Sequence, residues 1–421
     1  MQGLTRSSSS ELSEAFMVAT CRLNLEQPHV VCALMKTIIS FVAMLAWVAP
    51  LTAQNIYDSV LVGNVQRTYM THLPSGFDES KWYPVLLAFH GGQTAGRTDL
   101  GWQALALQGR LSEKADKEGF IVVYPEGQEF ATGRSWNAGA CCPPSASKGV
   151  DDVVFVDAML DKLFRDHRID TTRVYATGSS NGGMLCYRLA CELSHRIAAI
   201  APNACSHMIQ PCNPVNNVPI ISFHSRIDPI VLYKGGNGPD DVPFLKDVFF
   251  PSQDSNLVVW QQRNGCTKRD TIVNGGTLGY SFIRLSNCDC DVEVHHYATA
   301  DGGHSWPGGA PNNVSPPSTQ LNATDLLWDF LRRYTLGCGV TSATEHLCDT
   351  HIALYPNPAT TSLTINGIEA QASFTIVDIY GRVVAAGITA GSIDISPLPS
   401  GTYVLRLQQG GKVATLRFVR K

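Results

Sequence analysis

The chain has 421 residues, a formal net charge of −4 and no long run of basic residues, so its charge gives no reason to expect a nucleic-acid partner. Hydrophobic residues make up 44% and charged residues 16%, which is typical of a folded globular protein and argues against disorder. The length allows one large domain and a small one.

The N-terminal region contains an export signal that does not begin at residue 1. Lys36 precedes an apolar run from Ile38 to Leu51, and small residues follow before Gln54. We predict a signal peptide over residues 35–53, because the run is too short for a comfortable membrane span. Residues 1–34 carry several charges, and we interpret them as an upstream extension of a protein whose translation starts at Met35. No transmembrane span is predicted, and a lipoprotein anchor is disfavoured because Gln54 is not cysteine.

Thirteen cysteines also favour an oxidising destination. Cys21 and Cys32 precede the predicted mature start, so eleven remain in the body and at least one thiol must stay unpaired. Connectivity is left open. Zinc is the competing interpretation, but it is disfavoured because the sequence has no CxxC pair. We predict no metal and no cofactor.

Apolar runs alternate with helical patterns from Tyr83 to about Thr335. This alternation predicts an α/β domain over residues 54–337, with a mostly parallel sheet covered on both faces. Ligands of such sheets bind beyond the carboxyl ends of the strands. The predicted strands are 85–89, 120–124, 174–177, 197–201, 220–224 and 292–297, and the predicted helices are 105–117, 151–165, 184–192 and 324–333.

The sequence changes character after Thr335. Residues 338–350 are rich in Gly and Thr and indicate a linker. Residues 351–421 contain short alternating segments separated by turn residues, which predicts a small all-β module, most simply a sandwich.

Ser180 is the candidate nucleophile. Gly178-Ser179-Ser180-Asn181-Gly182 matches G-x-S-x-G, between a predicted strand and a predicted helix. A sharp strand-to-helix turn needs glycines on both sides and exposes the central hydroxyl at a helix N-terminus. A Ser/Gly loop without catalysis is the alternative, and the motif alone does not decide between them.

A base and an acid follow in the order expected for this motif, in which Ser precedes Asp and Asp precedes His. Asp228 comes just after the strand at 220–224, and His304 lies in a glycine-rich loop after the strand at 292–297. A serine hydroxyl needs such a base, held by an acid. Other His and Asp residues could serve as the base or the acid, but each has a simpler interpretation. His295 and His296 are interpreted as packing or surface residues, and His224 as a hydrogen-bonded wall residue. Helix capping is the default role of Asp151 and Asp152, and Asp301 lies in the same tight loop as His304.

The developing negative charge of an ester intermediate requires two backbone amides, which form an oxyanion hole. We predict one amide from Asn181, directly after the nucleophile. The other should come from the His90-Gly91-Gly92-Gln93 loop that follows the strand ending at Phe89. The choice between Gly92 and Gln93 is left open.

Several ordered motifs resemble those of the polyhydroxybutyrate depolymerase-like and feruloyl esterase group of secreted esterases. The resemblance covers about residues 62–335 and is carried by His90-Gly91-Gly92, 124–127, 135–139, 150–153, 178–183 and 302–308. It implies an α/β-hydrolase fold, no cofactor, and action on feruloyl or acetyl esters of plant cell-wall polysaccharide or on hydroxyalkanoate polyesters. It also implies substrate-pocket positions for His90, Trp136, Asn137 and Trp306, although core packing is at least as good an interpretation of Trp136.

The tail resembles the C-terminal sorting domain of the type IX secretion system of Bacteroidetes. The motifs that carry the resemblance are 355–358, 376–381, 398–403 and the terminal Arg420-Lys421. It implies that the secretion machinery is a partner and that the protein is released or attached at the outer surface. A polymer-binding sandwich is the alternative, but the tail contains no Trp and few aromatic residues for a stacking platform.

We therefore predict a secreted serine ester hydrolase, mainly a feruloyl or acetyl esterase acting on polysaccharide through Ser180, His304 and Asp228. A hydroxybutyrate polyester is the alternative substrate, and a non-catalytic surface-binding protein is the third hypothesis. The acyl and alcohol groups, the disulfide map and the oligomeric state are left open by the sequence.

Overall fold

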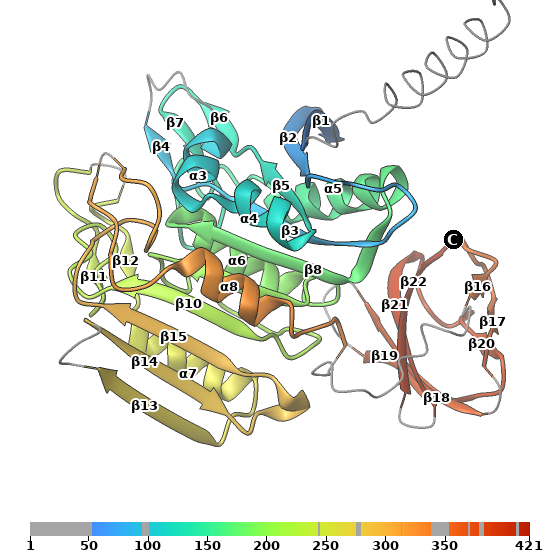
Figure 1. Ribbon diagram of the computed structural model, residues 1–421. Coiled ribbons are helices and arrows are strands. Elements are labelled where there is room, and N and C mark those ends of the chain that lie inside the picture. Colours follow the sequence, from blue (N-terminus) through green and yellow to red (C-terminus); the bar gives the residue numbers. More distant parts are fainter. Residues whose placement is uncertain are drawn as a thin grey trace, which may run out of the picture. The chain divides into compact units, whose positions relative to one another are not determined.

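The computed structural model describes residues 53–421 except 95–100, 243–244, 275–278, 313, 338–352, 369–370, 379–382 and 410–411 (Figure 1). The predicted upstream extension, the signal peptide up to residue 52 and the 338–350 linker therefore lie outside the described residues. None of the described helices has the length and apolar content needed to cross a membrane.

A ten-stranded sheet forms the centre of the larger domain, and its six inner strands are parallel. The antiparallel pairs lie at its two edges. The predicted mostly parallel sheet is confirmed, whereas the edge strands were not predicted because they lack a continuous apolar run. In spatial order the strands are β1 (Gln54–Val62), β2 (Val65–Leu73), β5 (Ile121–Pro125), β3 (Tyr83–Phe89), β8 (Ile169–Ser179), β9 (Ala199–Asn203), β10 (Ile220–Ser225), β15 (Val294–Thr299), β14 (Tyr280–Ser286) and β13 (Lys268–Asn274).

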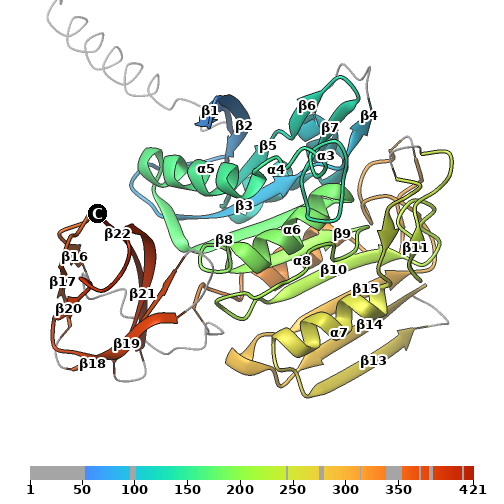
Figure 2. The same cartoon turned by 180° about the vertical axis from the view of Figure 1, so that it is seen from behind.

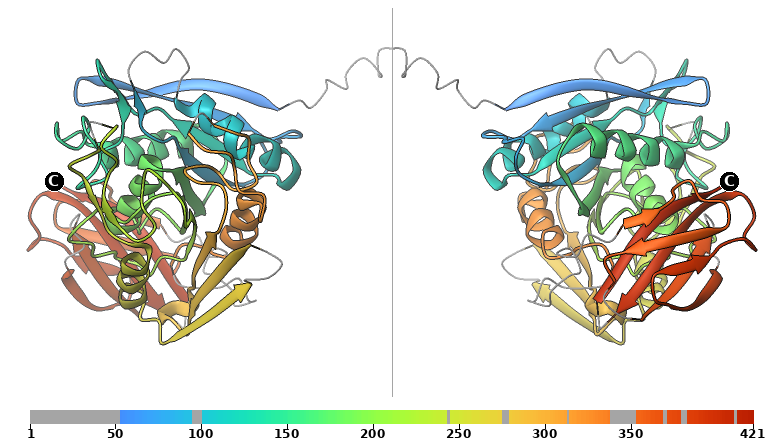
Figure 3. Two further views of the ribbon diagram at one scale, coloured as in Figure 1. Left: turned by 90° about the vertical axis from the view of Figure 1, so that its left-hand side faces the viewer. Right: turned by 90° about the vertical axis from the view of Figure 1, so that its right-hand side faces the viewer.

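Helices cover both faces of this sheet because its central strands are apolar on both sides. On β3, Val85 and Leu87 pack into one apolar cluster, while Leu86 and Ala88 pack into the other. Figure 1 shows one helix layer in front of the sheet, Figure 2 shows the other, and Figure 3 shows the layers from the side. The first layer contains α3 (Gly101–Gly109), α4 (Leu111–Glu118) and α8 (Ala323–Leu331), and the second contains α5 (Asp152–Asp166), α6 (Asn181–Glu192) and α7 (Gln253–Arg263).

One predicted helix is divided into two in the structure, so its predicted continuity was wrong. The pattern over 105–117 predicts a single helix, but the chain forms α3 and α4 with Arg110 between them at φ 48°. A left-handed residue interrupts the helical hydrogen-bond ladder, so the second helix starts in a new direction. Apolar spacing alone does not reveal such a break.

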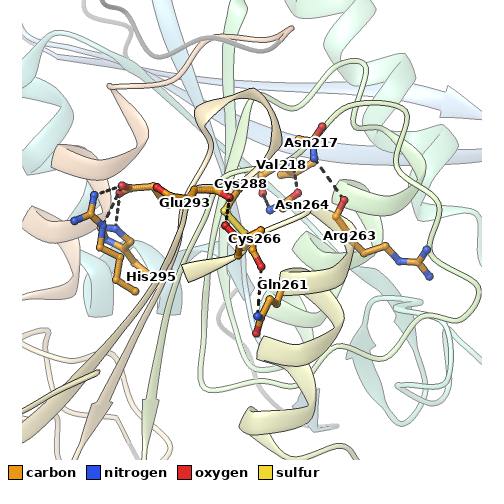
Figure 4. Close-up of a disulfide and its surroundings, with 12 residues drawn as sticks. Asn217, Val218, Gln261, Arg263, Asn264, Cys266, Cys288, Glu293 and His295 are labelled. Atoms are coloured by element: carbon orange, nitrogen blue, oxygen red, sulfur yellow. Dashed lines mark hydrogen bonds and ion pairs between the residues drawn. A yellow bond between two sulfur atoms is a disulfide. The ribbon is translucent and has the colours of Figure 1, made fainter. Parts of the chain in front are cut away.

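Disulfides cross-link the larger domain, in agreement with the predicted oxidising destination. Cys266 precedes β13 and Cys288 follows β14, so their disulfide closes the open end of this edge hairpin (Figure 4). Next to it, the Asn264 side chain accepts a hydrogen bond from the Val218 amide at 3.1 Å and donates one to the Val218 carbonyl at 2.8 Å. The other described pairs are Cys191–Cys212 and Cys141–Cys142, and the buried thiols of Cys186 and Cys205 are free, which confirms that at least one thiol stays unpaired.

The tail forms two antiparallel sheets around a small core of its own, which confirms the predicted all-β module. Leu363, Ile376, Leu405 and Phe418 are buried in this core. One sheet contains β16 (Ala353–Tyr355), β17 (Ser362–Asn366) and β20 (Ser392–Asp394), and the other contains β18 (Ala372–Asp378), β19 (Val383–Thr389), β21 (Gly401–Gln409) and β22 (Lys412–Arg420).

Candidate active site

Ser180 lies at a sharp turn between β8 and α6. Its backbone has φ 55° and ψ −124°, and its amide donates to the Asn203 carbonyl over 2.9 Å. This conformation is costly for a residue with a side chain and persists only where the surroundings enforce it. The flanking glycines are required sterically, because a Cβ at Gly178 would lie 2.6 Å from the backbone carbon of Gly182. The turn therefore presents the Ser180 side chain at the carboxyl end of a central strand.

Asp228 and His304 are joined although 76 residues separate them in the chain. His304 Nδ1 lies 3.0 Å from Asp228 Oδ1 and 2.9 Å from Oδ2. Asp228 is buried, with 3% of the residue exposed, and its Oδ1 also accepts the amides of Ile230 at 2.8 Å and Val231 at 3.0 Å. A buried carboxylate that accepts this many hydrogen bonds can orient an imidazole and stabilise its charged form.

The charge of Asp228 is stabilised by two imidazoles. Burial by itself would raise the pKa of the Asp228 carboxyl, but His304 and His224 together hold it well below its usual range. His224 Nε2 lies 2.8 Å from the Val231 carbonyl and 3.3 Å from Asp228 Oδ2. Because the carbonyl can only accept, this nitrogen carries the hydrogen and donates. His224 is thus a hydrogen-bonded residue behind the acid, in agreement with its simpler interpretation.

The loop that carries His304 depends on its glycines. Gly302 has φ 87° and Gly303 has φ 136°, values that side-chain-bearing residues rarely adopt. The His304 amide then donates to Ser315 Oγ at 3.1 Å, and Asn312 Nδ2 donates to the His304 carbonyl at 2.9 Å. These two hydrogen bonds fix the backbone of His304 and thereby position its imidazole.

A cavity of about 420 Å³ brings the candidate residues together. Ser180, His304, Asn181, Gly92 and Gln93 all line it, whereas Asp228 is linked to it through His304. The other lining residues are Thr132, Arg134, Ser135, Cys142, Pro143, Pro144, Ser147, Met184, Ile230, Val231, Val242, Leu245, Phe250 and Val314.

The glycine loop after β3 lies directly against the nucleophile. A Cβ at Gly91 would lie 3.3 Å from Ser180 Cβ and 4.0 Å from Ser180 Oγ, and one at Gly92 would lie 3.9 Å from Asn181 Cβ. A side chain at Gly91 would thus be in tight contact with Ser180, whereas one at Gly92 would make only an ordinary contact with Asn181. The loop and the start of α6 thus both lie close to Ser180, which is where the predicted oxyanion amides belong.

The four residues predicted as substrate-pocket candidates, His90, Trp136, Asn137 and Trp306, are not among the residues that line this cavity. Trp136 and Trp306 are fully buried, and their indole nitrogens donate to the His90 carbonyl and to Thr324 Oγ1. His90 is also buried, while Asn137 donates through Nδ2 to the Val150 carbonyl. The core-packing interpretation of Trp136 was therefore the better one.

The buried His90 side chain forms hydrogen bonds that hold the glycine loop in place. Its Nδ1 donates to the Gly91 carbonyl at 2.6 Å, and its Nε2 accepts the Gly127 amide at 2.9 Å. Both bonds require a neutral imidazole protonated at Nδ1. Burial lowers the pKa of His90, which favours this form.

The Trp136 segment also fixes Asn181. The Asn181 side chain accepts the Trp136 amide at 2.6 Å and donates to the Trp136 carbonyl at 2.9 Å. Beside it, Asp152 accepts the Asn137 amide at 2.7 Å and forms a buried ion pair with Arg67 at 2.7 Å. The network holds the residue that supplies the predicted oxyanion amide.

The two acidic residues at the start of α5 have different roles. Asp151 caps the helix by accepting the Val154 amide at 3.1 Å, as its default interpretation predicts. Asp152 does not cap the helix, because its carboxylate is turned into the core toward Arg67. The sequence held no signal for this pair, since its members are 85 residues apart.

Asn203, at the end of β9, is a further residue that sequence reasoning missed. Besides accepting the Ser180 amide, it donates through Nδ2 to Ser179 Oγ at 3.2 Å and to the Ser305 carbonyl at 3.0 Å. It therefore connects the nucleophile turn with the His304 loop.

One described group, Cys191, His207 and Cys212, is compact enough to suggest a metal site. Its two cysteines form a disulfide, so their sulfurs are not available as thiolate ligands. This group lies outside the residues that line the cavity.

The sheet order, the turn at Ser180 and the Asp228–His304 pair define the larger domain as an α/β-hydrolase. Two family models match parts of the chain. Residues 67–251 match the esterase PHB depolymerase family, and residues 353–421 match the secretion system C-terminal sorting domain. The sorting domain indicates export to the cell surface or the extracellular space.

The similar curated proteins are esterases and depolymerases. Feruloyl esterase B of Piromyces equi is 28% identical over 64% of this chain and 46% of its own length, and the bifunctional acetylxylan esterase/xylanase XynS20E of Neocallimastix patriciarum is 28% identical over 60% and 31%. Poly(3-hydroxyalkanoate) depolymerase C of Paucimonas lemoignei is 31% identical over 34% and 31%. The chain thus spans less than half the length of each of these relatives. Among solved structures, the acetyl xylan esterase from Aspergillus awamori has a TM-score of 0.44 at 12% identity, and the match covers 66% of this chain and 99% of that one.

Proposed function

We propose that this protein is an exported serine esterase that hydrolyses carboxylic esters of plant cell-wall polysaccharide, mainly feruloyl esters. The observation that carries the proposal is the shared cavity of Ser180 and His304, with the imidazole held by the buried carboxylate of Asp228. A base oriented in this way can activate a hydroxyl that is exposed at a strained turn.

The proposed first step is acyl transfer to Ser180. Ionised Asp228 accepts the Nδ1 hydrogen of His304, so Nε2 is the nitrogen left to take the Ser180 proton as Oγ attacks the ester carbonyl. The amide of Asn181 and one from Gly92 or Gln93 stabilise the oxygen that becomes negative. The imidazolium then gives its proton to the leaving alcohol oxygen, and an acyl-enzyme remains.

Water completes the proposed cycle. His304 removes a proton from the attacking water molecule, the acyl-enzyme bond breaks, and Ser180 Oγ recovers the proton. Each proton passes between groups that the cavity already brings together. The steps require no group beyond these residues, the ester and water.

The cavity supports a bulky acyl group. Its volume of about 420 Å³ is far more than an acetyl group occupies, and lies in the range of sites for ligands of drug size, roughly 300–1,000 Å³. Met184, Val231, Leu245 and Phe250 provide apolar surface on which an aromatic ring can be buried. The names of two of the similar proteins, feruloyl esterase and acetylxylan esterase, support the same substrate class.

A polyester of hydroxybutyrate is the second candidate substrate. It is favoured by the family match of residues 67–251 and by the similarity to the Paucimonas depolymerase. The chemistry at Ser180 is the same for both substrates, so the shape and polarity of the cavity wall must separate them.

A parallel assay on methyl ferulate, acetylated xylan and a hydroxybutyrate polyester tests the substrate proposal. We expect kcat/KM for methyl ferulate to exceed that for the acetyl ester by at least about tenfold, since burying the additional aromatic surface stabilises the larger acyl group. Released ferulate is measured by absorbance, and acetate and hydroxybutyrate are measured enzymatically. Faster release of hydroxybutyrate than of ferulate would favour the polyester instead, and inertness toward all three would contradict the esterase.

We further propose that the tail is an address read by a type IX secretion system, because residues 353–421 match a sorting domain. Deletion of 353–421 should leave active esterase inside the source bacterium and remove nearly all activity from the medium and the cell surface. Total activity per cell provides the control for expression. Undiminished activity outside the cell would show that the tail is not the export signal.

A further inference from the structure

The deeply buried part of the cavity wall is mainly apolar. It includes Met184, Val231, Leu245 and Phe250, each of which has at most 7% of its surface exposed. The cavity measures about 420 Å³, which suits a ligand of drug size but cannot enclose a polysaccharide chain. An esterified polysaccharide can therefore place its acyl group inside, while its sugar chain must lie against the exposed part of the wall.

The exposed part of the wall is more polar. Apart from Gly92, the exposed lining residues are Thr132, Ser147 and Val314, and Arg134 is partly exposed. We call Thr132, Arg134 and Ser147 the polar rim of the cavity. Their hydroxyl and guanidinium groups can form hydrogen bonds with a ligand that extends out of the cavity. The polar rim is therefore the surface to search for a group that recognises the alcohol side of the ester.

Arg134 has the largest number of hydrogen-bond donors in the polar rim, because a guanidinium carries five N–H groups. Its Nε pairs with Glu126 at 3.2 Å and its Nη2 pairs with Glu129 at 2.9 Å, whereas Nη1 has no partner among the described residues. Of this side chain, 14% is exposed, and none of its nitrogens is among the described buried atoms without a partner. The remaining N–H groups are therefore accessible to a ligand.

A short hairpin holds Arg134 in position (Figure 1). β6 (Gln128–Phe130) pairs with β7 (Gly133–Ser135) so that Glu129 is directly opposite Arg134. Opposite residues of an antiparallel pair have side chains on the same face, so this ion pair follows from the register of the hairpin. The second carboxylate, Glu126, is buried and also accepts the Gly101 amide at 2.8 Å. A guanidinium anchored by two carboxylates loses little freedom when it binds a ligand.

The two carboxylates also determine which kind of ligand Arg134 suits. They balance its positive charge, so the group has no excess charge that would attract an anion. Its remaining N–H groups can only donate, and the carboxylate of Glu129, of which 69% is exposed, can only accept. A hydroxyl group complements both, because it accepts from the first and donates to the second. Sugars carry many hydroxyls, whereas the ester oxygens along a hydroxyalkanoate polyester can only accept.

We propose that Arg134 is a specificity-determining residue that donates a hydrogen bond to a hydroxyl of the sugar on the alcohol side of the scissile ester. The apolar interior of the cavity encloses the acyl group of the same substrate. This assignment rests on the proposed esterase function and adds to it the residue that recognises the alcohol. Arg134 should therefore affect the rate for esters of sugars and have little effect on esters of simple alcohols.

The test compares two substrates that share the acyl group. For wild type and Arg134→Met, kcat/KM is measured on a feruloylated arabinose oligosaccharide and on methyl ferulate, and the ratio of the two values is calculated. We expect the ratio to fall about tenfold in Arg134→Met, because the variant loses a charge-assisted hydrogen bond to the sugar. Arg332→Met is the matched control and should keep the wild-type ratio. Arg332 also pairs with two carboxylates, those of Glu118 and Asp329, but it does not line the cavity.

Arg134→Lys provides a second variant if methionine impairs folding, because it keeps a positive charge beside Glu126 and Glu129. It should lower the ratio as well, since one ammonium cannot reproduce the fork of N–H groups that serves two carboxylates and a ligand. An unchanged or increased ratio in a folded Arg134 variant, with wild type active on methyl ferulate, would overturn the role of Arg134 and leave the esterase intact. Failure of the wild type to hydrolyse methyl ferulate would overturn the feruloyl esterase proposal and the sugar contact that rests on it.

Discussion

Replacement of Ser180 by alanine is expected to lower kcat on methyl ferulate by about 10⁴- to 10⁶-fold, the range found when serine hydrolases lose the nucleophile. The change removes only Oγ from a residue at φ 55°, so the turn is kept and slightly relieved of crowding. The glycine loop and His304 remain in the cavity and continue to bind the ester. The residual rate should therefore be that of a binding site without a nucleophile, and KM should change little.

Ser179→Ala is the matched control, because it removes a hydroxyl from the neighbouring residue. Ser179 Oγ accepts a hydrogen bond from Asn203 and does not line the cavity, so this variant should stay within about tenfold of wild type. Circular dichroism and thermal unfolding check that both variants are folded. A Ser180→Ala enzyme with wild-type kcat would exclude Ser180 as the nucleophile.

Asp228→Asn is expected to lower kcat by about 10⁴-fold, close to the effect of removing the acid in other serine hydrolases. The amide is isosteric but can donate to His304 Nδ1, which would place the imidazole hydrogen on Nε2, where it cannot accept the Ser180 proton. The loss should therefore appear in kcat, with KM little changed. Hydrolysis of methyl ferulate at neutral pH measures it, and Asp301→Asn, a change in a carboxylate that bonds Ser318 and Thr319, is the control outside the cavity.

The pH dependence of stability provides a second readout for Asp228. Its pKa in the folded protein is held below the usual value, so the folded state binds its proton less readily than the unfolded chain does. The stability that this carboxylate contributes is present above the unfolded pKa, about 3.9, and is lost as the pH falls through the folded value. Wild type should thus lose stability between about pH 5 and pH 2, and Asp228→Asn should lose less. Equal acid sensitivity of the two in denaturant titrations would contradict this.

The sequence by itself carried the local features of the site. The turn at Ser180 could be inferred because its geometry depends on neighbouring glycines, and the order of Asp228 and His304 followed from their positions just after strands. Parallel strands bring their carboxyl ends to one edge, so residues at successive strand ends meet even when far apart in the chain. The division into an α/β domain and an all-β tail followed from the change in apolar periodicity at about residue 335.

Only the tertiary structure decided which aromatic and polar residues reach the cavity. Trp136 lies in a motif shared with esterases, yet its ring packs on Phe89 and Phe155 behind the glycine loop. The Arg67–Asp152 ion pair and the contacts of Asn203 likewise join segments that no local pattern relates. Such contacts depend on how distant segments pack against one another and are not encoded in any single residue.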